Sequence, residues 1–221
     1  MVYRYIYIFR HGKTYYNTFH KFTGWKDSRL TIEGVRQAKK IAEQLKNKKI
    51  NVAFQTTLKR SKQTLKYVLR GHPECKKIIT DDRIIERSYG RLEGKTHKNF
   101  IEKEGSDDYK TLLRWHKIDH LQGAEKEKFI HAIGQAEFDL VHRSWKVRPS
   151  GGESFSDVET RVKPFINDLT KYIKKNKVNV AISAHGNSIR LFRKIMEKSS
   201  IRDTCSWFIP YDKVFTYKIK V

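Results

Sequence analysis

Short apolar runs separated by amphipathic stretches make up the hydropathy pattern of this chain. Runs rich in β-branched and aromatic residues predict strands. The clearest predicted strands are residues 2–9, 50–54, 178–183 and 214–221, with a weaker candidate at 78–85. The first run stops abruptly at an arginine, a histidine and a glycine, which are groups that a buried strand does not need.

Between these runs, apolar residues recur at the spacing of one helix face. Thr31 suits the N-cap of the first predicted helix. A later helix is expected to open with a capping box formed by Ser156 and Glu159. The predicted helices lie at residues 30–47, 56–71, 156–175 and 189–197.

Strands and helices alternate along the chain with short connections. This order predicts a three-layer α/β/α sandwich with a mostly parallel central sheet. Residues 98–149 are polar, with helical spacing and no clear strand, so we interpret them as an inserted helical cap. The length of 221 residues and the lack of a linker-like stretch favour one domain over residues 1–221.

Composition adds one unusual feature, a formal net charge of +23 from 47 Lys and Arg against 24 Asp and Glu. Such a field attracts anions, whether nucleic acid, acidic membrane or small phosphorylated metabolites. The sequence carries no RNA-binding aromatic motif, zinc-finger spacing or helix-turn-helix pattern. We therefore expect a small phosphorylated metabolite as the partner, and neither nucleic acid nor a membrane.

The chain contains no stretch of about 18 uncharged apolar residues and no leader-like N-terminus. A cytoplasmic protein is expected on that basis. Cys75 and Cys205 are too few for a disulfide framework or a metal cluster, so two reduced thiols are expected.

Two predicted strands end in the same way. Arg10 and His11 precede a glycine after the first strand, and His185 precedes Gly186 after the run at 178–183. Ligands of open α/β sheets bind beyond the carboxyl ends of the strands, so both histidines are expected in one crevice. Glycine permits a sharp turn close to a ligand, and the helix after Asn187 points its N-terminus at the same place. These features predict an anion site.

Each piece alone has a plainer interpretation. A histidine at a strand end is more often structural than catalytic, and Glu86 could form a surface salt bridge with Arg87. Arg60, at the start of a helix, completes a set with complementary chemistry. The set of two histidines, an arginine pair and a carboxylate carries the functional interpretation.

Six motifs occur in a fixed order, namely RHGKTYYN, FTGWKDSRLTIEG, LKRSKQT, ERSYGRLEGK, GGESFSDVETRV and AHGNSIR. Over residues 3–95 and 150–193 the chain resembles the histidine phosphatase superfamily, most of all its cofactor-dependent phosphoglycerate mutase branch. The resemblance implies phosphoryl transfer through a phosphohistidine without a metal ion. For a mutase it also implies 2,3-bisphosphoglycerate as the phosphoryl primer.

The resemblance and the chemistry of phosphate esters together suggest a role for each residue. Neutral His11 is expected to attack phosphorus, and Glu86 to act first as general acid and then as general base. Guanidinium groups suit phosphate because their planar fork can bind two oxygens. The expected phosphate donors are Arg10, Arg60 and His185, supplemented by Asn17, Gly186 and Asn187.

Three further positions resemble the substrate-binding segments of the mutases. Thr23 and Gly24 match the segment that contacts the carboxylate end of the substrate, and Tyr89 matches a substrate-facing tyrosine. Phe22 and Trp25 are interpreted as core aromatics.

The chain also departs from the mutase pattern. His97 stands where a lysine is usual, Lys13 replaces an acidic residue, and Arg114 is the only near match to a pair of substrate-binding arginines. The printed sequence ends with the run at 214–221, so we expect no long C-terminal tail over the site. An uncovered phosphoenzyme would lose its phosphoryl group to water more readily.

Three hypotheses follow. The first, slightly favoured, is a phosphoglycerate mutase that keeps His11 phosphorylated. The second is a metal-independent phosphatase with the same site and water as acceptor. The third is a basic protein that binds polyanions on an old enzyme fold. Substrate identity and oligomeric state stay open, a homo-oligomer included.

Overall fold

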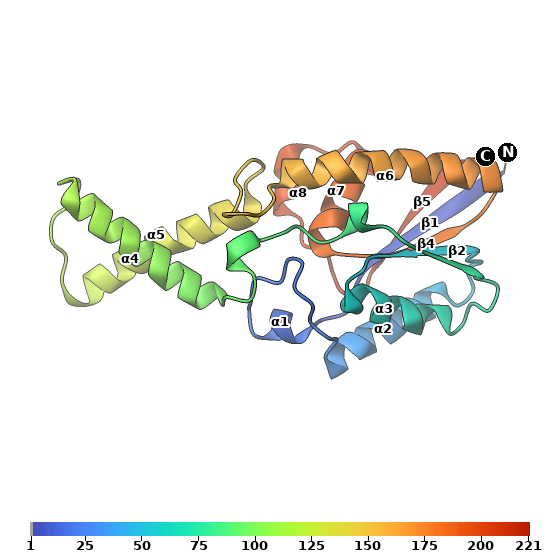
Figure 1. Cartoon of the computed structure of the whole chain (residues 1–221), viewed down its shortest axis with the longest axis horizontal. Coiled ribbons are helices and arrows are strands. Elements are labelled where there is room, and N and C mark those ends of the chain that lie inside the picture. Colours follow the sequence, from blue (N-terminus) through green and yellow to red (C-terminus); the bar gives the residue numbers. More distant parts are fainter. Residues whose placement is uncertain (1) are drawn as a thin grey trace.

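The computed structural model describes residues 2–221 and contains a five-stranded sheet between two layers of helices (Figure 1). The strand order is β3-β2-β4-β1-β5, and only β5 runs antiparallel to its neighbour. The prediction of a three-layer α/β/α sandwich with a mostly parallel sheet is confirmed. The strands are β1 (Tyr3–Arg10), β2 (Val52–Gln55), β3 (Lys77–Thr80), β4 (Val180–Ala184) and β5 (Val214–Lys220).

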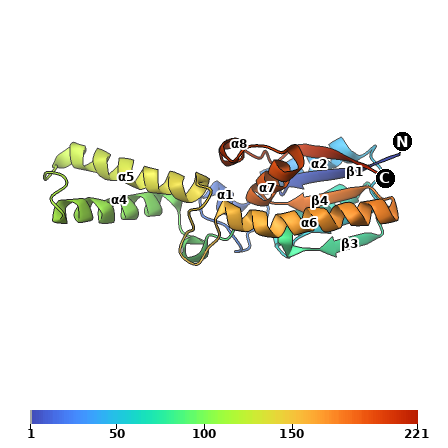
Figure 2. The same cartoon turned by 90° about the horizontal axis from the view of Figure 1, so that it is seen from above.

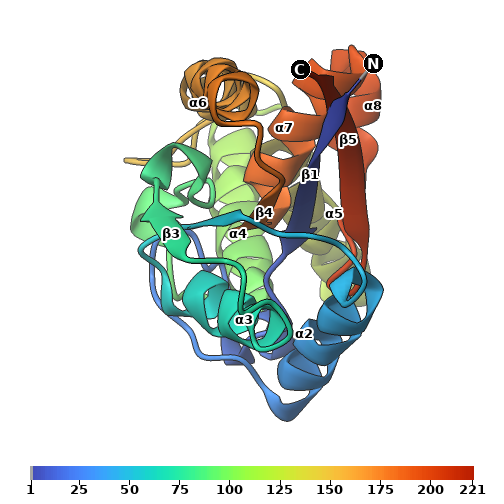
Figure 3. The same cartoon turned by 90° about the vertical axis from the view of Figure 1, so that its right-hand side faces the viewer.

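Helices cover both faces of the sheet, as the end-on view makes clear (Figure 3). One layer contains α2 (Ile32–Leu45) and α3 (Lys59–Leu69), and the other contains α6 (Phe155–Asn176) and α7 (Gly186–Glu197). Shorter elements connect these layers. They are α1 (Tyr15–Thr18), η1 (Asp82–Ile84), η2 (Gly90–Leu92) and α8 (Ile201–Ser206).

The hydropathy pattern of β1 is explained by the helices on both faces of the sheet. Tyr7 and Phe9 pack into the cluster beneath α2 and α3, whereas Ile6 and Ile8 pack into the larger cluster beneath α6 and α7. Because both faces of a parallel sheet are buried, its central strands read as continuous apolar runs rather than as alternating ones. The strand therefore becomes polar only at its carboxyl end, beyond the core.

Helices α4 (His97–Arg114) and α5 (Gly123–Arg143) form a hairpin that projects from the sandwich (Figure 2). The two helices cross closely at a pair of glycines. A Cβ atom at Gly105 would lie 2.0 Å from the Ile130 carbonyl oxygen, and one at Gly134 would lie 1.9 Å from that of Ile101. Only hydrogen atoms at these two positions allow the backbones to approach this far.

Gly105→Ala is therefore expected to loosen the hairpin, although alanine favours helices. Forcing the backbones apart should destabilise the hairpin by about 1–3 kcal/mol. Faster amide hydrogen exchange along α4 and α5 would report the effect. Gly71→Ala is the matched control, because a Cβ atom there meets nothing within 4 Å. Unchanged exchange in the Gly105 variant would contradict the prediction.

Several local expectations need correction. Helix α6 begins earlier than predicted, because Ser154 and Asp157 form its capping box rather than Ser156 and Glu159. The weak strand at 78–85 ends at Thr80, and the chain then turns into η1. Phe22 is buried as expected, but Trp25 is half exposed.

The cap of Thr31 on α2 is confirmed, since its side chain accepts a hydrogen bond from the Gly34 amide. Helix α7 begins at Gly186, three residues before the start predicted from its apolar stripe. Across residues 2–221, the structure has no helix long and apolar enough to span a membrane.

Candidate active site

The parallel strands β1 and β4 lie side by side, so their carboxyl ends meet at one edge of the sheet. Arg10 is in register with Ala184, and the amide of His11 donates to the Ala184 carbonyl at 3.0 Å. The rings of His11 and His185 are 5.0 Å apart. Because the helices that follow β1 and β4 cover opposite faces of the sheet, this edge is a topological switch point, where α/β sheets bind ligands.

The turn after His11 depends on close backbone packing. A Cβ atom at Gly12 would lie 2.1 Å from the Gly34 carbonyl oxygen at the start of α2. This glycine is therefore needed for the approach of helix α2, rather than for the approach of a ligand as the sequence suggested. Helix α2 in turn holds the His11 segment against the sheet.

The hydrogen bond of His11 defines its tautomer. Its Nδ1 lies 2.8 Å from the Gly12 carbonyl oxygen. A carbonyl oxygen can only accept, so Nδ1 carries the proton and Nε2 keeps its lone pair. Neutral His11 therefore has the protonation pattern that a nucleophilic imidazole requires.

The surroundings of His11 keep the ring neutral. Burial lowers its pKa well below the ordinary value, and the positive charges of Arg60 and Arg10 lower the pKa further. Burial also lowers the pKa of Arg60, to about 10, which still leaves the guanidinium protonated near neutrality. A neutral nucleophile beside fixed positive charges suits attack on an anionic substrate.

His185 lies at the N-cap of α7 and is completely buried. Its Nε2 is 2.8 Å from the Thr56 hydroxyl, which follows β2. Burial lowers the pKa of His185 well below its ordinary value, and the charge of Arg60 adds to the effect. A neutral His185 ring that forms hydrogen bonds therefore fits this site better than a protonated one.

Glu86 is buried and hydrogen-bonded to two backbone amides. Its Oε1 accepts from Asn187 N at 3.0 Å and from Arg87 N at 2.8 Å. The surface salt bridge considered for Glu86 and Arg87 does not exist, because the Arg87 side chain is fully buried over the rings of Tyr89 and Phe155. The Glu86 carboxylate is therefore held at the N-terminus of α7.

The backbone of Glu86 is fixed from two sides. The Trp25 Nε1 donates to its carbonyl at 2.8 Å, and Arg161 Nη2 donates to the same oxygen at 3.0 Å. The Arg161 guanidinium also pairs with the Glu153 carboxylate at 2.8 Å. Trp25 thus has a positioning role that its interpretation as a core aromatic missed.

A cavity of about 390 Å³ opens above these groups, between the sheet edge and the base of the hairpin. Most of the residues expected from the sequence line it. They are Arg10, Asn17, Thr23, Gly24, Glu86, Tyr89, His97, Gly186 and Asn187. The side-chain oxygen of Asn17 is occupied in capping α1, which leaves its amide nitrogen to offer to a ligand.

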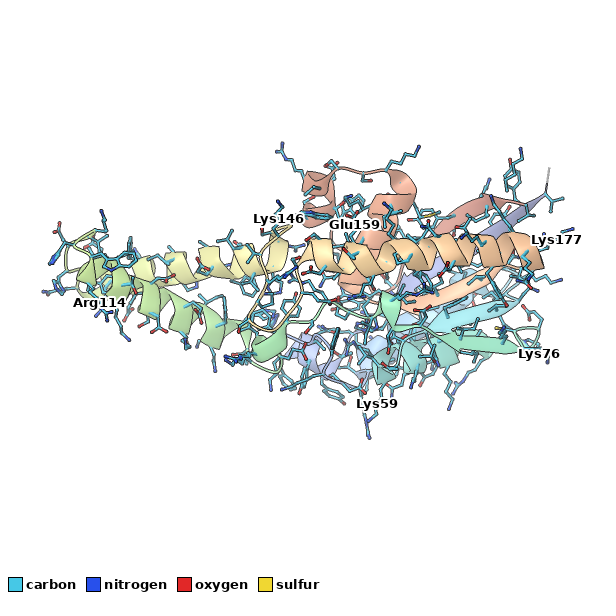
Figure 4. All side chains as sticks on the ribbon, turned by 45° about the horizontal axis from the view of Figure 1, so that its top comes forward. Lys59, Lys76, Arg114, Lys146, Glu159 and Lys177 are labelled. Atoms are coloured by element: carbon cyan, nitrogen blue, oxygen red, sulfur yellow. The ribbon has the colours of Figure 1, made fainter. Side chains whose placement is uncertain are left out.

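Two expected ligand contacts, Arg60 and Arg114, are placed differently, and a third, His97, is uncharged. Arg60 is completely buried and holds the loop before α2, donating to the carbonyls of Gly24 at 2.6 Å and Lys26 at 2.8 Å. Burial and the neighbouring His20 lower the pKa of His97 to about 4, so it brings no positive charge at neutral pH. Arg114 ends α4 at the far tip of the hairpin (Figure 4), away from the cavity that it was expected to line.

The cavity also contains residues that sequence reasoning missed. Arg190 stands in the AHGNSIR motif, four residues after Gly186, so helical spacing could have placed it on the same face of α7. The remaining residues come from segments without a motif, and only the tertiary structure brings them here. They are His20, Lys21, His142, Arg143, Phe208, Ile209 and Tyr211, and Lys13 joins them although the sequence marked it only as a departure.

Three groups here could also hold a metal ion. Ligand atoms of His11, Glu86 and His185 lie within 4.8 Å of one another. The nearby guanidinium groups of Arg10 and Arg60 oppose a divalent cation and favour an anion at the same place. Independence from metal ions stays a prediction.

Buried histidines predict that stability falls in mild acid. The pKa of His142 is lowered to about 2 by burial and by neighbouring charges, Arg87 foremost. The unfolded chain binds a proton at this residue as pH drops below 6.5, whereas the folded chain does not, so stability present at pH 7 is lost on acidification. At pH 5 this one residue should cost about 2 kcal/mol.

Urea unfolding at pH 7 and pH 5 measures this loss. His11 and His185 add to it in the same direction. In His142→Phe the difference between the two pH values should shrink by about 2 kcal/mol, because the titrating ring is gone. Equal stability of the native chain at both pH values would refute the assignment of neutral buried histidines.

Comparisons with known proteins agree with this geometry. The model of the histidine phosphatase superfamily (branch 1) matches residues 6–131 and 113–210 of the chain. A 2,3-bisphosphoglycerate-dependent phosphoglycerate mutase from Chlamydia caviae is 32% identical over 212 residues, which cover 95% of this chain and 91% of the relative. The resemblance that the six motifs indicated is confirmed.

Solved structures of similar fold include both mutases and phosphatases. Phosphoglycerate mutase from Bacillus anthracis has a TM-score of 0.70 at 22% identity, over 99% of this chain and 88% of that chain. A mycobacterial glucosyl-3-phosphoglycerate phosphatase has a TM-score of 0.66 at 21% identity, over 93% and 84% respectively. Because the family model matches most of the length of this chain, the chain belongs to the histidine phosphatase superfamily.

Proposed function

We propose that this protein transfers phosphoryl groups through a phosphohistidine at His11 and interconverts 3-phosphoglycerate and 2-phosphoglycerate. One observation carries the proposal. The His11 Nδ1 proton is held by the Gly12 carbonyl, so Nε2 keeps a free lone pair on a ring that lies close to the buried Glu86 carboxylate and to the positive charge of Arg10. In this proposal no metal ion takes part, and 2,3-bisphosphoglycerate primes the enzyme.

The first step is attack on phosphorus. The His11 Nε2 forms a bond to phosphorus as the bond from phosphorus to the leaving oxygen breaks. Arg10 and the Gly186 amide at the start of α7 stabilise the oxygens of the transferring group, which carry most of the charge in the transition state. The Asn187 amide holds the Glu86 carboxylate instead. Positioning and charge neutralisation account for catalysis here, because the phosphoryl group itself needs little covalent assistance.

Proton transfer by Glu86 completes the cycle. Protonated Glu86 gives its proton to the leaving oxygen and is left as a carboxylate. The carboxylate then takes the proton of the acceptor hydroxyl, which attacks the phosphohistidine and releases neutral His11. When the acceptor is the other hydroxyl of a three-carbon acid, the net result is isomerisation.

Two observations support the mutase activity. The relative from Chlamydia caviae carries this name at 32% identity along nearly the whole chain. Thr23, Gly24 and Tyr89 line the cavity, as the mutase motifs imply. The relative alone would not carry the assignment, because the same fold also serves phosphatases.

A phosphatase with the same site is the second candidate. His97 is neutral and Arg114 is remote, so two of the expected contacts to a phosphoglycerate are missing. Weaker binding of the acceptor phosphoglycerate to the phosphoenzyme would allow water to take the phosphoryl group from His11. The first step of the mechanism is the same for both activities.

Phosphorus NMR distinguishes the two activities. The purified protein is mixed with 3-phosphoglycerate and a trace of 2,3-bisphosphoglycerate, and His11→Ala is treated in parallel. A growing 2-phosphoglycerate signal is expected for a mutase. Free phosphate in its place would identify a phosphatase, and a panel of phosphorylated metabolites would then define its substrate.

The His11→Ala variant tests whether His11 is the group that accepts the phosphoryl group. Both products should vanish with His11→Ala. Turnover that persists in this variant would overturn the phosphohistidine mechanism. No product from the native chain with this substrate or with the panel would overturn the proposed activity altogether.

A further inference from the structure

The segment between α8 and β5 forms part of the cavity wall, through Phe208, Ile209 and Tyr211. It is anchored on both sides of Tyr211. Ile209 is 1% exposed and packs into the larger core cluster. The Asp212 carbonyl accepts a hydrogen bond from Gln44 Nε2 on α2 at 2.7 Å. The position of the Tyr211 ring is therefore fixed by the fold.

The Tyr211 ring lies against two groups of the candidate active site. The Arg10 Cζ is 3.9 Å from the centroid of the ring, well within the range of a cation–π contact. The edge of the same ring meets His11, with 6.3 Å between the ring centroids. A side chain outside all six motifs thus contacts both the arginine that serves the phosphate and the nucleophile of the proposed mechanism.

Gly186 packs against the same guanidinium. A Cβ atom at Gly186 would lie 3.4 Å from the Cζ and the Nε of Arg10 and 3.5 Å from its Nη2. Because these distances are nearly equal, the glycine lies over a face of the guanidinium and not at its edge. Tyr211 is not among the atoms nearest to this Cβ position, so its ring covers the opposite face. The Arg10 guanidinium is therefore held between a glycine and an aromatic ring.

Only one side of this guanidinium remains free to bind a ligand. The Arg10 Nη1 donates to the Ile209 carbonyl at 2.8 Å. The Arg10 Nε is buried and has no partner among residues 2–221, and Nη2 makes no hydrogen bond in that part of the chain either. A buried donor without a partner is costly. Nε and Nη2 form the side of the planar fork that matches two phosphoryl oxygens.

We propose that Tyr211 is a positioning residue, which stacks on Arg10 and keeps the Nε and Nη2 side of the guanidinium directed at the transferring phosphoryl group. The inference rests on the proposed function and adds a residue to its machinery. An arginine side chain has many rotamers, and the stack removes that freedom before the substrate binds. Preorganised donors contribute most in the transition state, so Tyr211 should favour five-coordinate phosphorus over a tetrahedral phosphate.

Binding of orthovanadate and of inorganic phosphate tests the proposal without requiring turnover. Vanadate bonded to a nucleophile adopts the five-coordinate geometry of phosphoryl transfer, whereas phosphate stays tetrahedral. Titration calorimetry with dilute anions at pH 7.5 should show that the native protein prefers vanadate by about 100-fold or more, as for other transition-state analogues. Tyr211→Leu should reduce this preference by about tenfold, because the cation–π contact is lost.

Further variants separate positioning from folding. Tyr211→Leu should change the affinity for phosphate by less than about threefold, which would show that the variant is folded. Tyr211→Phe keeps the ring and should retain the native preference for vanadate. Tyr67→Leu is the matched control, because Arg70 lies over the half-buried Tyr67 ring at 4.7 Å and neither residue lines the cavity. Its preference should equal that of the native chain.

The outcomes distinguish this inference from the proposed function. A preference that Tyr211→Leu keeps in full would overturn the positioning role, and so would equal affinity of the native protein for the two anions. An equal loss in Tyr211→Phe and Tyr211→Leu would overturn it as well, because the hydroxyl and not the ring would then matter. If the preference depends on the ring but no phosphate monoester leaves a phosphohistidine on the native chain, the positioning role stands and the proposed function fails.

Discussion

Replacing His11 with alanine is expected to abolish the phosphoenzyme and to lower turnover by at least about 10⁴-fold. The variant lacks the Nε2 that would bond to phosphorus, and no neighbouring group can take its place. His185 is completely buried, and its Nε2 is engaged with the Thr56 hydroxyl. What remains is the arrangement of positive charge, which binds phosphate but cannot attack it.

Phosphorus NMR of the protein after brief mixing with 2,3-bisphosphoglycerate would detect a phosphohistidine directly. The matched control is His72→Ala. His72 is also nearly buried, but it contacts Glu74 and does not line the cavity. Its loss should leave the phosphoenzyme and turnover intact, so a drop common to both variants would indicate damage to the fold rather than loss of the nucleophile.

Glu86→Gln is expected to have a different effect, a phosphoenzyme that forms slowly and then persists. Glutamine keeps the side-chain oxygen that accepts from Asn187 N and Arg87 N, so the local structure should hold. It cannot take a proton from the acceptor hydroxyl, and it cannot protonate the leaving oxygen. Turnover should fall by about 10²–10⁴-fold, the usual contribution of a general acid or base.

Single-turnover mixing followed by phosphorus NMR would separate the two steps. The phosphohistidine signal of Glu86→Gln should outlast that of the native chain by the factor lost in turnover. Glu159→Gln is the control, because the Glu159 carboxylate pairs with Lys194 outside the cavity. A phosphohistidine that decays at the native rate in Glu86→Gln would assign the proton transfers to another group.

The contrast between the two variants is informative. Loss of the nucleophile removes the intermediate, whereas loss of the acid and base traps it. A protein that only bound phosphate on this fold would show neither result, because it would form no intermediate. The pair of variants therefore tests the enzyme hypothesis against the polyanion-binding hypothesis.

Much of the candidate active site could be predicted from the sequence. His11 and His185 follow predicted strands directly, and parallel strands bring their carboxyl ends to one sheet edge. Local sequence therefore placed both rings in the same crevice. Motifs at the ends of β1 and β4 also predicted Arg10 and the amides after His185. The motif that contains Glu86 follows the end of another strand, β3.

The base of the hairpin could not be predicted in this way. Arg143 and His142 end a long helix whose sequence shows helical spacing but no motif, and Arg114 ends the neighbouring helix in a similar context. Nothing local distinguishes the end that meets the cavity from the end that lies at the free tip. The direction in which the hairpin projects determines which helix ends lie at the cavity. The crossing of its two helices at Gly105 and Gly134 depends on contacts between residues that are far apart in the chain.

Three features could be inferred from the sequence, namely the order of strands and helices along the chain, the helix layers on both faces of the sheet and the histidine pair at its edge. These features depend on periodicity and on residues next to strand ends, which are local properties of the chain. The tertiary structure was needed to tell which arginines line the cavity. Arg60 is withdrawn behind the loop that it holds, while Arg190 and Arg143 line the cavity from two elements. The physical reason is that burial and charge pairing depend on neighbours from distant parts of the sequence, which no local pattern encodes.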